Sequence, residues 1–236
     1  MYHSITFGDK NTWDDWRLIP VSRPVLNPPA VREKFIDIPG RNGLLDLSTL
    51  FTGEPTYTNR VGSFEMVVHP DYYPSIDVVY SNVRNHLHGK RMQMVLEDDP
   101  VHYYEGLFFI SRAEAGSKFN VLTIDYDISP YKSEFTTSVD DWEWDPFNFE
   151  TGYVQQLDDL SVNGANSLTV ELYGSHKQMS LSFITSANLT VKYGGNTYSL
   201  PTGTTVVPGL KMVPGINTLV FSGTGTVSII YRGGSL

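Results

Sequence analysis

The sequence contains no cysteine, has fewer basic than acidic residues, and lacks any long apolar run. The absence of cysteine excludes disulfides, thiol nucleophiles, iron–sulfur clusters and cysteine-bound zinc. The 17 basic and 26 acidic side chains give a formal net charge of −9, which is poorly suited to binding nucleic acid. No apolar run approaches the ~20 residues of a membrane-spanning helix, so we expect no membrane insertion. The acidic first 20 residues are not typical of a signal peptide.

The length of the chain and the change in its charge along the sequence predict two folded domains. It is 40% hydrophobic, and its 236 residues suit one large or two small domains. Residues 1–133 hold 13 basic and 17 acidic side chains, whereas residues 134–159 hold eight acidic and no basic ones. From residue 160 onward only Glu171 is acidic. Because Ser129-Pro130 disfavours continued regular structure, we predict domains of residues 1–132 and 133–236.

The first domain is predicted to contain one helix and several strands. Apolar residues recur with helical spacing from Ile76 to Leu87, with Ser75 as a candidate N-cap and Gly89 as a C-terminal left-handed residue. Strands are predicted over residues 35–38, 44–47, 63–68, 91–96, 103–111 and 119–127. The last three of these should form a meander.

The second domain shows no helical periodicity. Short β-type runs cover residues 167–173, 179–184, 188–193, 197–200, 218–221 and 226–231, separated by turns rich in glycine or proline. Turn signals at such spacing predict an antiparallel sandwich or jelly roll. The fold class is therefore mainly β with one helix.

No arrangement of residues points to catalysis, a metal site or a cofactor, so we expect a protein that is not an enzyme. His86 and His88, two residues apart on a helix, would face different directions. No Gly-x-Ser-x-Gly elbow is present. Three acidic pairs raise the possibility of a glycosidase, but adjacent acids on a strand point to opposite faces, and solvated turns and strand faces are the better interpretation. These pairs are Asp98-Asp99, Asp125 with Asp127, and Asp140-Asp141.

One aromatic stretch, around Trp142 and Trp144, has the composition of a recognition surface. Aromatic rings beside carboxylates stack on sugars, which would make this a ligand or partner surface. On a strand, however, both Trp side chains share one face, and packing between sheets or at an interdomain contact is the better interpretation. Both interpretations stay open.

Particular segments of the first domain resemble the distal tail protein family of long-tailed siphophages. Two segments are the most specific. One is the predicted strand at residues 35–38 with the Pro39–Gly43 turn and the Leu-Leu-Asp-Leu strand at residues 44–47, and the other is the His-Gly-Lys sequence at residues 88–90, where the helix ends. The resemblance covers residues 1–132 well, and the remainder only in architecture. The matching segments are Val21–Pro29, Glu33–Ser48, Phe51–Gly53, Asn59–Arg60, Leu87–Arg91, Asp98–Pro100, Tyr103–Gly106 and Asp125–Lys132.

The resemblance implies a structural virion protein at the distal tip of a phage tail, made in the cytoplasm of the host bacterium. Members form a hexameric ring between the tail tube and the tail-associated fibre or lysin protein, leaving a channel for DNA. The first domain would be tail-tube-like and ring-forming, and the second a peripheral, galectin-like β-sandwich. The implied partners are other copies of the chain, the tail tube protein, the fibre or lysin protein and a receptor-binding protein.

Within the first domain, the connection from Arg41 to Arg60 is predicted to contact a neighbouring subunit, because it holds too many apolar residues for a free loop. Two alternatives remain open: a glycan-binding adhesin that acts through the second domain, and a polysaccharide-degrading enzyme in which two carboxylates converge. The predicted interface residues are Arg41, Leu44, Leu45, Leu47, Leu50, Phe51 and Arg60.

Overall fold

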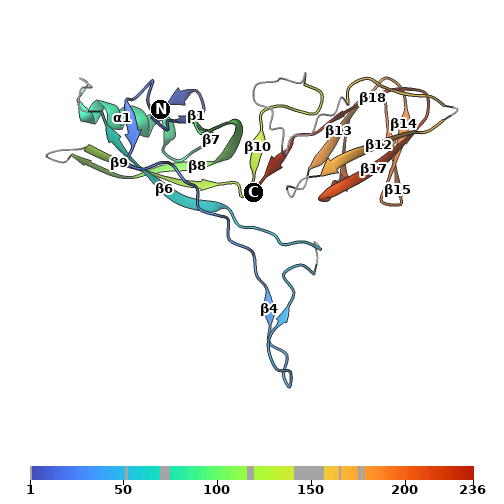
Figure 1. Ribbon diagram of the computed structural model, residues 1–236, viewed down its shortest axis with the longest axis horizontal. Coiled ribbons are helices and arrows are strands. Elements are labelled where there is room, and N and C mark those ends of the chain that lie inside the picture. The colour runs from blue at the N-terminus through green and yellow to red at the C-terminus, as the bar shows by residue number, and fades with distance from the viewer. Residues whose placement is uncertain are drawn as a thin grey trace. The chain divides into compact units, whose positions relative to one another are not determined.

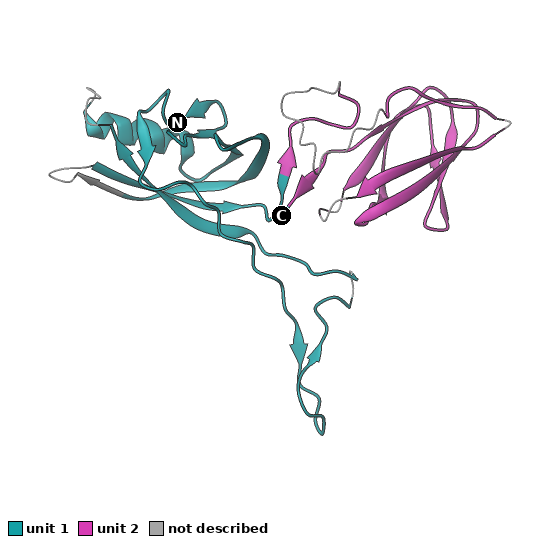
Figure 2. Cartoon of the chain, in the orientation of Figure 1, with its two compact units in different colours: residues 1–132, 236 teal, residues 133–235 magenta. Residues whose placement is uncertain are grey.

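A computed structural model describes residues 2–50, 53–69, 75–115, 120–140, 157–164, 166–174, 177 and 179–236. These residues form a mainly β fold with one helix, which confirms the predicted fold class. The chain divides into two compact units, residues 1–132 with residue 236, and residues 133–235 (Figure 2). The short strands β10 (Lys132–Glu134) and β19 (Gly234–Ser235) pair with each other.

The first unit is built on a sheet with the strand order β2-β1-β7-β8-β9-β6-β3. The predicted meander corresponds to β7-β8-β9, and β6 pairs antiparallel with the far edge of β9. In β9, even-numbered residues from Leu122 to Ile128 are buried and odd-numbered ones are half-exposed, as its alternating sequence predicted. The long strands are β6 (Arg60–Val68), β7 (Lys90–Leu96), β8 (Asp99–Ala115) and β9 (Asn120–Ile128).

Three short strands near the N-terminus were not predicted from the sequence. They extend the sheet at both edges, with β1 pairing with β7 and β3 with β6. At two or three residues each they are too short to show a period of two, so tertiary pairing rather than local pattern determines them. They are β1 (Ile5–Phe7), β2 (Lys10–Asn11) and β3 (Leu18–Pro20).

One helix, α1 (Ile76–Leu87), covers one face of this sheet (Figure 1). Its buried residues Val79, Tyr80, Val83 and Leu87 belong to the same apolar cluster as the inward residues of the strands, as the helical spacing predicted. Gly89 follows the helix with φ +73°, which confirms its predicted left-handed conformation. Ser75 precedes the helix, but its side chain makes no capping hydrogen bond.

A long two-stranded extension, residues 21–59, leaves the body of the first unit between β3 and β6 (Figure 1); we call it the arm. The predicted strand, turn and strand are present in it as β4 (Phe35–Ile36) and β5 (Leu45–Asp46), which pair antiparallel but are shorter than expected.

The second unit is an antiparallel β-sandwich, as predicted. One sheet has the order β11-β18-β13-β16 and the other β12-β17-β14-β15, and their inward residues form one apolar cluster. The first sheet consists of β11 (Leu160–Val162), β13 (Ser180–Thr185), β16 (Gly203–Lys211) and β18 (Gly225–Ile230). The second consists of β12 (Leu168–Gly174), β14 (Leu189–Tyr193), β15 (Asn196–Leu200) and β17 (Gly215–Ser222).

Two strands of the sandwich were missed in the sequence. Strand β16 contains Pro208 and Gly209, which argue against a strand, yet it lies at the edge of its sheet, where proline is tolerated. Its register on β13 is irregular between Ser180 and Ser182. Strand β11 is only three residues long and is also an edge strand.

The position of Val83 gives a test of this fold. Val83 lies on the buried face of α1 and is completely buried. Val83→Asp would therefore bury an unpaired carboxylate, which costs several kcal/mol against a total stability of roughly 5–15 kcal/mol. We expect a large drop in the melting temperature of the first unit, measured by circular dichroism. Val78 lies on the same helix and is 50% exposed, so Val78→Asp is the matched control and should melt close to the wild type.

Candidate assembly surfaces

The arm is an apolar extension without a core of its own. Of its described residues, none belongs to the buried cluster of the first unit, although Leu26 packs against that cluster. Pairs of backbone hydrogen bonds join its two halves, such as Arg32 N–H to Thr56 O and Thr58 N–H to Ala30 O, both 2.8 Å. Large apolar side chains are exposed along its length: Val21, Val25, Val31, Phe35, Ile36, Ile38, Leu44 and Leu50. Apolar exposure of this extent is typical of interaction surfaces.

The predicted interface residues fall in two different environments. Leu44 and Leu50 are 58% and 63% exposed, and Arg41 is also exposed. Leu45 and Leu47 are half-buried along the second half of the arm. Phe51 lies outside the described residues. Arg60, by contrast, is buried at the root of the arm.

Arg60 joins the two chain segments that meet at the root of the arm. Its Nε donates to the carbonyl oxygen of Pro130 at 2.8 Å and its guanidinium Nη1 to that of Asn27 at 3.0 Å, while the guanidinium lies over the ring of Tyr104. A planar guanidinium carries donors at fixed angles, so one side chain orients both segments.

Asn27 makes further contacts at the same place. Its backbone N–H donates to the Tyr126 hydroxyl at 3.2 Å, and its side-chain amide donates to the Val61 carbonyl at 2.9 Å. A Cβ on Gly62 would lie 2.3 Å from the Tyr126 hydroxyl, so only glycine leaves room for this contact. The root of the arm is therefore a specific structure, whereas the arm beyond it is exposed.

The turn between β7 and β8 provides a second set of anchors. The Asp98 carboxylate accepts hydrogen bonds from the His3 ring at 2.9 Å and from Arg23 Nε at 2.9 Å, and Arg23 lies in the first part of the arm. Asp99 accepts from His102 at 2.6 Å and from Lys132 at 2.7 Å. The prediction of a turn at this acidic pair is confirmed, but the two carboxylates are half-buried rather than freely solvated, and each bonds a residue distant in sequence.

These contacts also shift the ionisation of the two acids. The hydrogen bond from His3, helped by that from Arg23, holds the pKa of Asp98 below its ordinary value. Burial of Asp99 opposes its charged form, but the hydrogen bonds from Lys132 and His102 outweigh this effect and lower its pKa as well.

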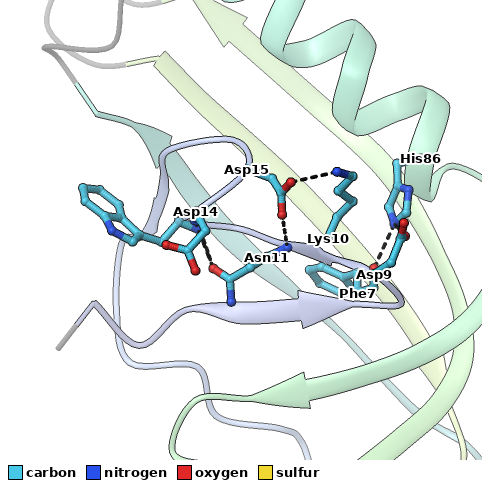
Figure 3. Close-up of polar contacts among 8 residues, drawn as sticks. Phe7, Asp9, Lys10, Asn11, Asp14, Asp15 and His86 are labelled. Carbon is cyan, nitrogen blue, oxygen red and sulfur yellow. Dashed lines mark hydrogen bonds and ion pairs between the residues drawn. The ribbon is translucent and has the colours of Figure 1, made fainter.

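The N-terminal corner of the unit is fixed by a similar local network, shown in Figure 3. Lys10 donates to Asp15 at 2.8 Å, and the other oxygen of Asp15 accepts from the Asn11 backbone N–H at 2.8 Å. The hydrogen bond from Lys10, followed by that from Asn11, lowers the pKa of Asp15. At the end of α1, His86 Nε2 donates to the Phe7 carbonyl at 2.8 Å (Figure 3).

The two neighbouring histidines have structural partners on different strands, which agrees with the prediction that they face different directions. His86 contacts β1 through Phe7, and His88 Nδ1 accepts from the Ile110 N–H of β8 at 3.0 Å. The described residues contain no group of three His, Asp or Glu side chains placed to hold a metal ion. Nor does a helix in that part of the chain have the length and apolar character to cross a membrane.

The sheet face opposite α1 is open and carries both acidic and apolar side chains, the latter including the exposed Val61 and Phe109. Asp125 and Asp127 of β9 lie on it, with Glu65 on β6 and Glu105 on β8. Arg91 of β7 reaches Glu105 at 3.6 Å, a weak exposed pair. The two strand-face acids of β9 are thus on one face, as their spacing predicted, and Asp127 accepts a hydrogen bond from Asn59 at 2.7 Å.

The surface of the second unit has few exposed aromatic rings among the described residues. Phe183 and Phe221 are fully buried, Tyr193 and Tyr198 are partly buried against the core, and Tyr173 is 49% exposed. Trp142 and Trp144, predicted as a ligand or packing surface, lie outside the described residues, as does Asp141.

Comparison with known proteins places this fold in a recognisable class. No family model matches the sequence, and no curated protein matches it. In three dimensions the chain is similar to a hub protein of a phage adsorption apparatus. That structure is the SPP1 Dit (gp 19.1) protein, described as a paradigm of the hub adsorption apparatus in Gram-positive infecting phages. The TM-score is 0.58 over 100% of both chains at 11% sequence identity, so the likeness shows a shared fold.

The lowered pKa values of Asp98 and Asp99 predict an acid-sensitive first unit. The pKa of each acid in the folded state lies below the ordinary value near 3.9. The stabilisation that the ionised carboxylates provide is therefore present above about pH 4, and it is lost as the pH falls through the pKa of the folded state. Asp99→Asn should lower the melting temperature at pH 7 and reduce its fall between pH 5 and pH 3. Asp14, an exposed acid of the same unit, provides the control: Asp14→Asn should keep the wild-type profile. Identical profiles for all three proteins would contradict this assignment.

Proposed function

We propose that this chain is a structural, non-enzymatic protein of a phage tail tip that assembles into a homohexameric ring. The observation that carries the proposal is the arm: a ribbon with eight large exposed apolar side chains, on a fold similar to a phage hub protein. An isolated two-stranded ribbon is marginally stable in water, so a partner that covers it is required. A second copy of the chain is the partner that is always present.

The charge of the arm suits this contact. Residues 21–59 carry four basic and four acidic side chains, so the arm is formally neutral although the whole chain carries −9. A neutral apolar arm lies on an acidic neighbour without strong repulsion. Because the arm and its receiving surface are different parts of the molecule, the contact is heterologous, and repeated copies close into a ring or continue as a filament. The sixfold closure follows from the resemblance to distal tail proteins.

The open face of the first sheet is the best candidate for the wall of a central channel. Four carboxylates lie on it. The basic residues that β7 and β8 place on the same face are Arg91 and Arg112, so the acids outnumber these bases. Like charge suppresses adhesion of DNA phosphates to a surface, so such a wall would let DNA pass without binding it. In this arrangement the ring joins the tail tube to the fibre or lysin protein.

The second unit is assigned a peripheral role, as a galectin-like sandwich available to adhesion components such as a receptor-binding protein. In the distal tail arrangement this unit does not build the channel. The chain would accordingly be a virion component at the distal tail tip.

Substitutions in the arm test the ring. Burial of a leucine side chain contributes about 1.5–3 kcal/mol, so Leu44→Ser should raise the concentration needed for assembly about tenfold or more, without changing the melting temperature of the monomer. Val206 of the second unit is 58% exposed, equal to Leu44, and Val206→Ser is the matched control. Light scattering and negative-stain imaging of concentrated or partner-bound samples give mass and symmetry. A stoichiometry other than sixfold, or equal assembly of both variants, would refute the proposal.

A second measurement addresses the adhesin alternative. The strand aromatics of the sandwich are mostly used in packing, so we expect no saturable binding of host-wall saccharides by the second unit. Nuclear magnetic resonance titration of the full chain with such saccharides checks this directly. Millimolar or tighter binding that maps to the sandwich and is lost in a Trp142→Ala or Trp144→Ala variant would favour the adhesin instead.

A further inference from the structure

The tip of the arm carries an Asn-Gly dipeptide in an exposed turn. Residues 38–44 are all exposed, and no atom outside residues 42–44 lies within 4 Å of the place where a Cβ on Gly43 would stand. The turn is closed by one hydrogen bond, from Arg41 N–H to the Ile38 carbonyl at 3.1 Å. Among the described residues, neither the Asn42 carboxamide nor the Gly43 N–H has a hydrogen-bond partner.

We propose that Asn42 is a site of spontaneous deamidation, by which an unassembled chain modifies its own arm. The Gly43 backbone nitrogen loses its proton to water and attacks Asn42 Cγ. A bond forms between these two atoms, the bond from Cγ to Nδ2 breaks, and Nδ2 leaves with a proton as ammonia. Water then opens the cyclic imide at either carbonyl, giving aspartate or isoaspartate. The net reaction consumes one water and releases one ammonia, with no oxidation or reduction.

Two features of the tip favour this reaction. Glycine puts no side chain in the path of the attacking nitrogen, and its backbone reaches conformations closed to other residues. The attack also requires the peptide between Asn42 and Gly43 to rotate. At an exposed tip, beyond the last ladder pair of Ile36 with Leu45, little opposes that rotation.

The chain contains its own control in a second Asn-Gly dipeptide, Asn163-Gly164 of the second unit. There the Asn163 carbonyl accepts from the Asn166 N–H at 2.8 Å, and the two residues form a β-bridge. A Cβ on Gly164 would lie 2.4 Å from the Thr224 hydroxyl, so this glycine, although exposed, has a close neighbour that the glycine at the arm tip lacks. The same deamidation reaction would therefore be hindered by a restrained backbone at Asn163 but not at Asn42.

The consequence for assembly rests on the proposed function. Deamidation places a negative charge beside Arg41, and the isoaspartyl product adds a backbone carbon to the tip. Both products alter the segment that we assign to the contact with a neighbouring copy. A tip covered by a neighbour is held against the required rotation, so modification is confined to chains that have not assembled.

Timed incubation of the full-length chain at mildly alkaline pH tests the site itself. Digestion with a glutamate-specific protease and mass spectrometry measure conversion at both dipeptides, and isoaspartyl methyltransferase labelling identifies the isomer. We expect Asn42 to convert severalfold faster than Asn163, with isoaspartate detected, and Asn42→Gln to abolish the fast conversion while Asn163→Gln leaves it unchanged. Equal rates at the two sites, or an unmodified Asn42, would overturn the inference.

Comparison of dilute and ring samples then separates this inference from the proposed function. Slower conversion of Asn42 in rings than in the Leu44→Ser variant supports both. Fast conversion in dilute chains with no protection in rings keeps the modification site but removes the arm tip from the interface. No conversion in dilute chains, with rings formed normally, refutes the modification site alone.

Discussion

A two-stranded ribbon has no interior, and this constraint governs the arm and everything that holds it. Side chains on such a ribbon have no opposite layer to pack on, so Phe35, Ile36 and Leu44 stay exposed in the single chain. The free energy that keeps the arm in place must come from its root and from whatever covers it. Exposed apolar side chains of this kind are what the proposed contact with a neighbouring copy would cover.

The root meets this constraint with polar contacts rather than apolar packing. Arg60 is buried, and the hydrogen-bond partners it has among the described residues are carbonyl oxygens, at Asn27 and Pro130, rather than carboxylates. Directional bonds to two carbonyls fix an angle, which an apolar contact at the same place would leave loose. Asp98, through Arg23, ties the arm to the turn between β7 and β8. Two independent anchors therefore set the direction in which the arm leaves the sheet.

Those features of the fold that repeat over many residues were predictable from the sequence. Helix α1 buries four of the five residues of its predicted stripe, with Ile76 half-buried, and strand β9 buries every expected one, because one periodic face of each packs on the core. Strands β1, β2 and β3 have two or three residues and carry no such signal, and β16 was hidden by Pro208. The alternation in β9 also predicted that one face of the first sheet is open to solvent. The short strands at the edges of that sheet could not be predicted in this way.

For the candidate surfaces, the sequence showed which residue types gather in a segment, but not which of them are exposed and which are buried. The excess of leucine between Arg41 and Arg60 was visible, and Leu44 and Leu50 are exposed as a contact surface requires. Arg41 and Arg60 looked equivalent at the ends of that segment, yet one is exposed at the tip and the other is buried at the root. Long-range partners decide this difference: Asn27 and Pro130 are 33 and 70 residues from Arg60. The turn at Asp98 and Asp99 was predictable, but not the partners of the two acids, because His3 and Lys132 are distant in sequence.

Charge explains why an apolar arm, rather than ion pairs, is suited to join copies of this chain. Each copy carries a formal −9, so neighbouring bodies repel, and salt screens that repulsion only beyond a Debye length of about 8 Å at physiological ionic strength. A contact between copies made through parts of the chain other than the arm would bring like charges within that distance. In the proposed ring, the arm would instead place a neutral segment, with four bases and four acids, between one acidic subunit and the next. Hydrophobic burial depends little on ionic strength, whereas repulsion between the bodies weakens as salt is added. Assembly through the arm should therefore strengthen with salt, whereas assembly held by ion pairs would weaken.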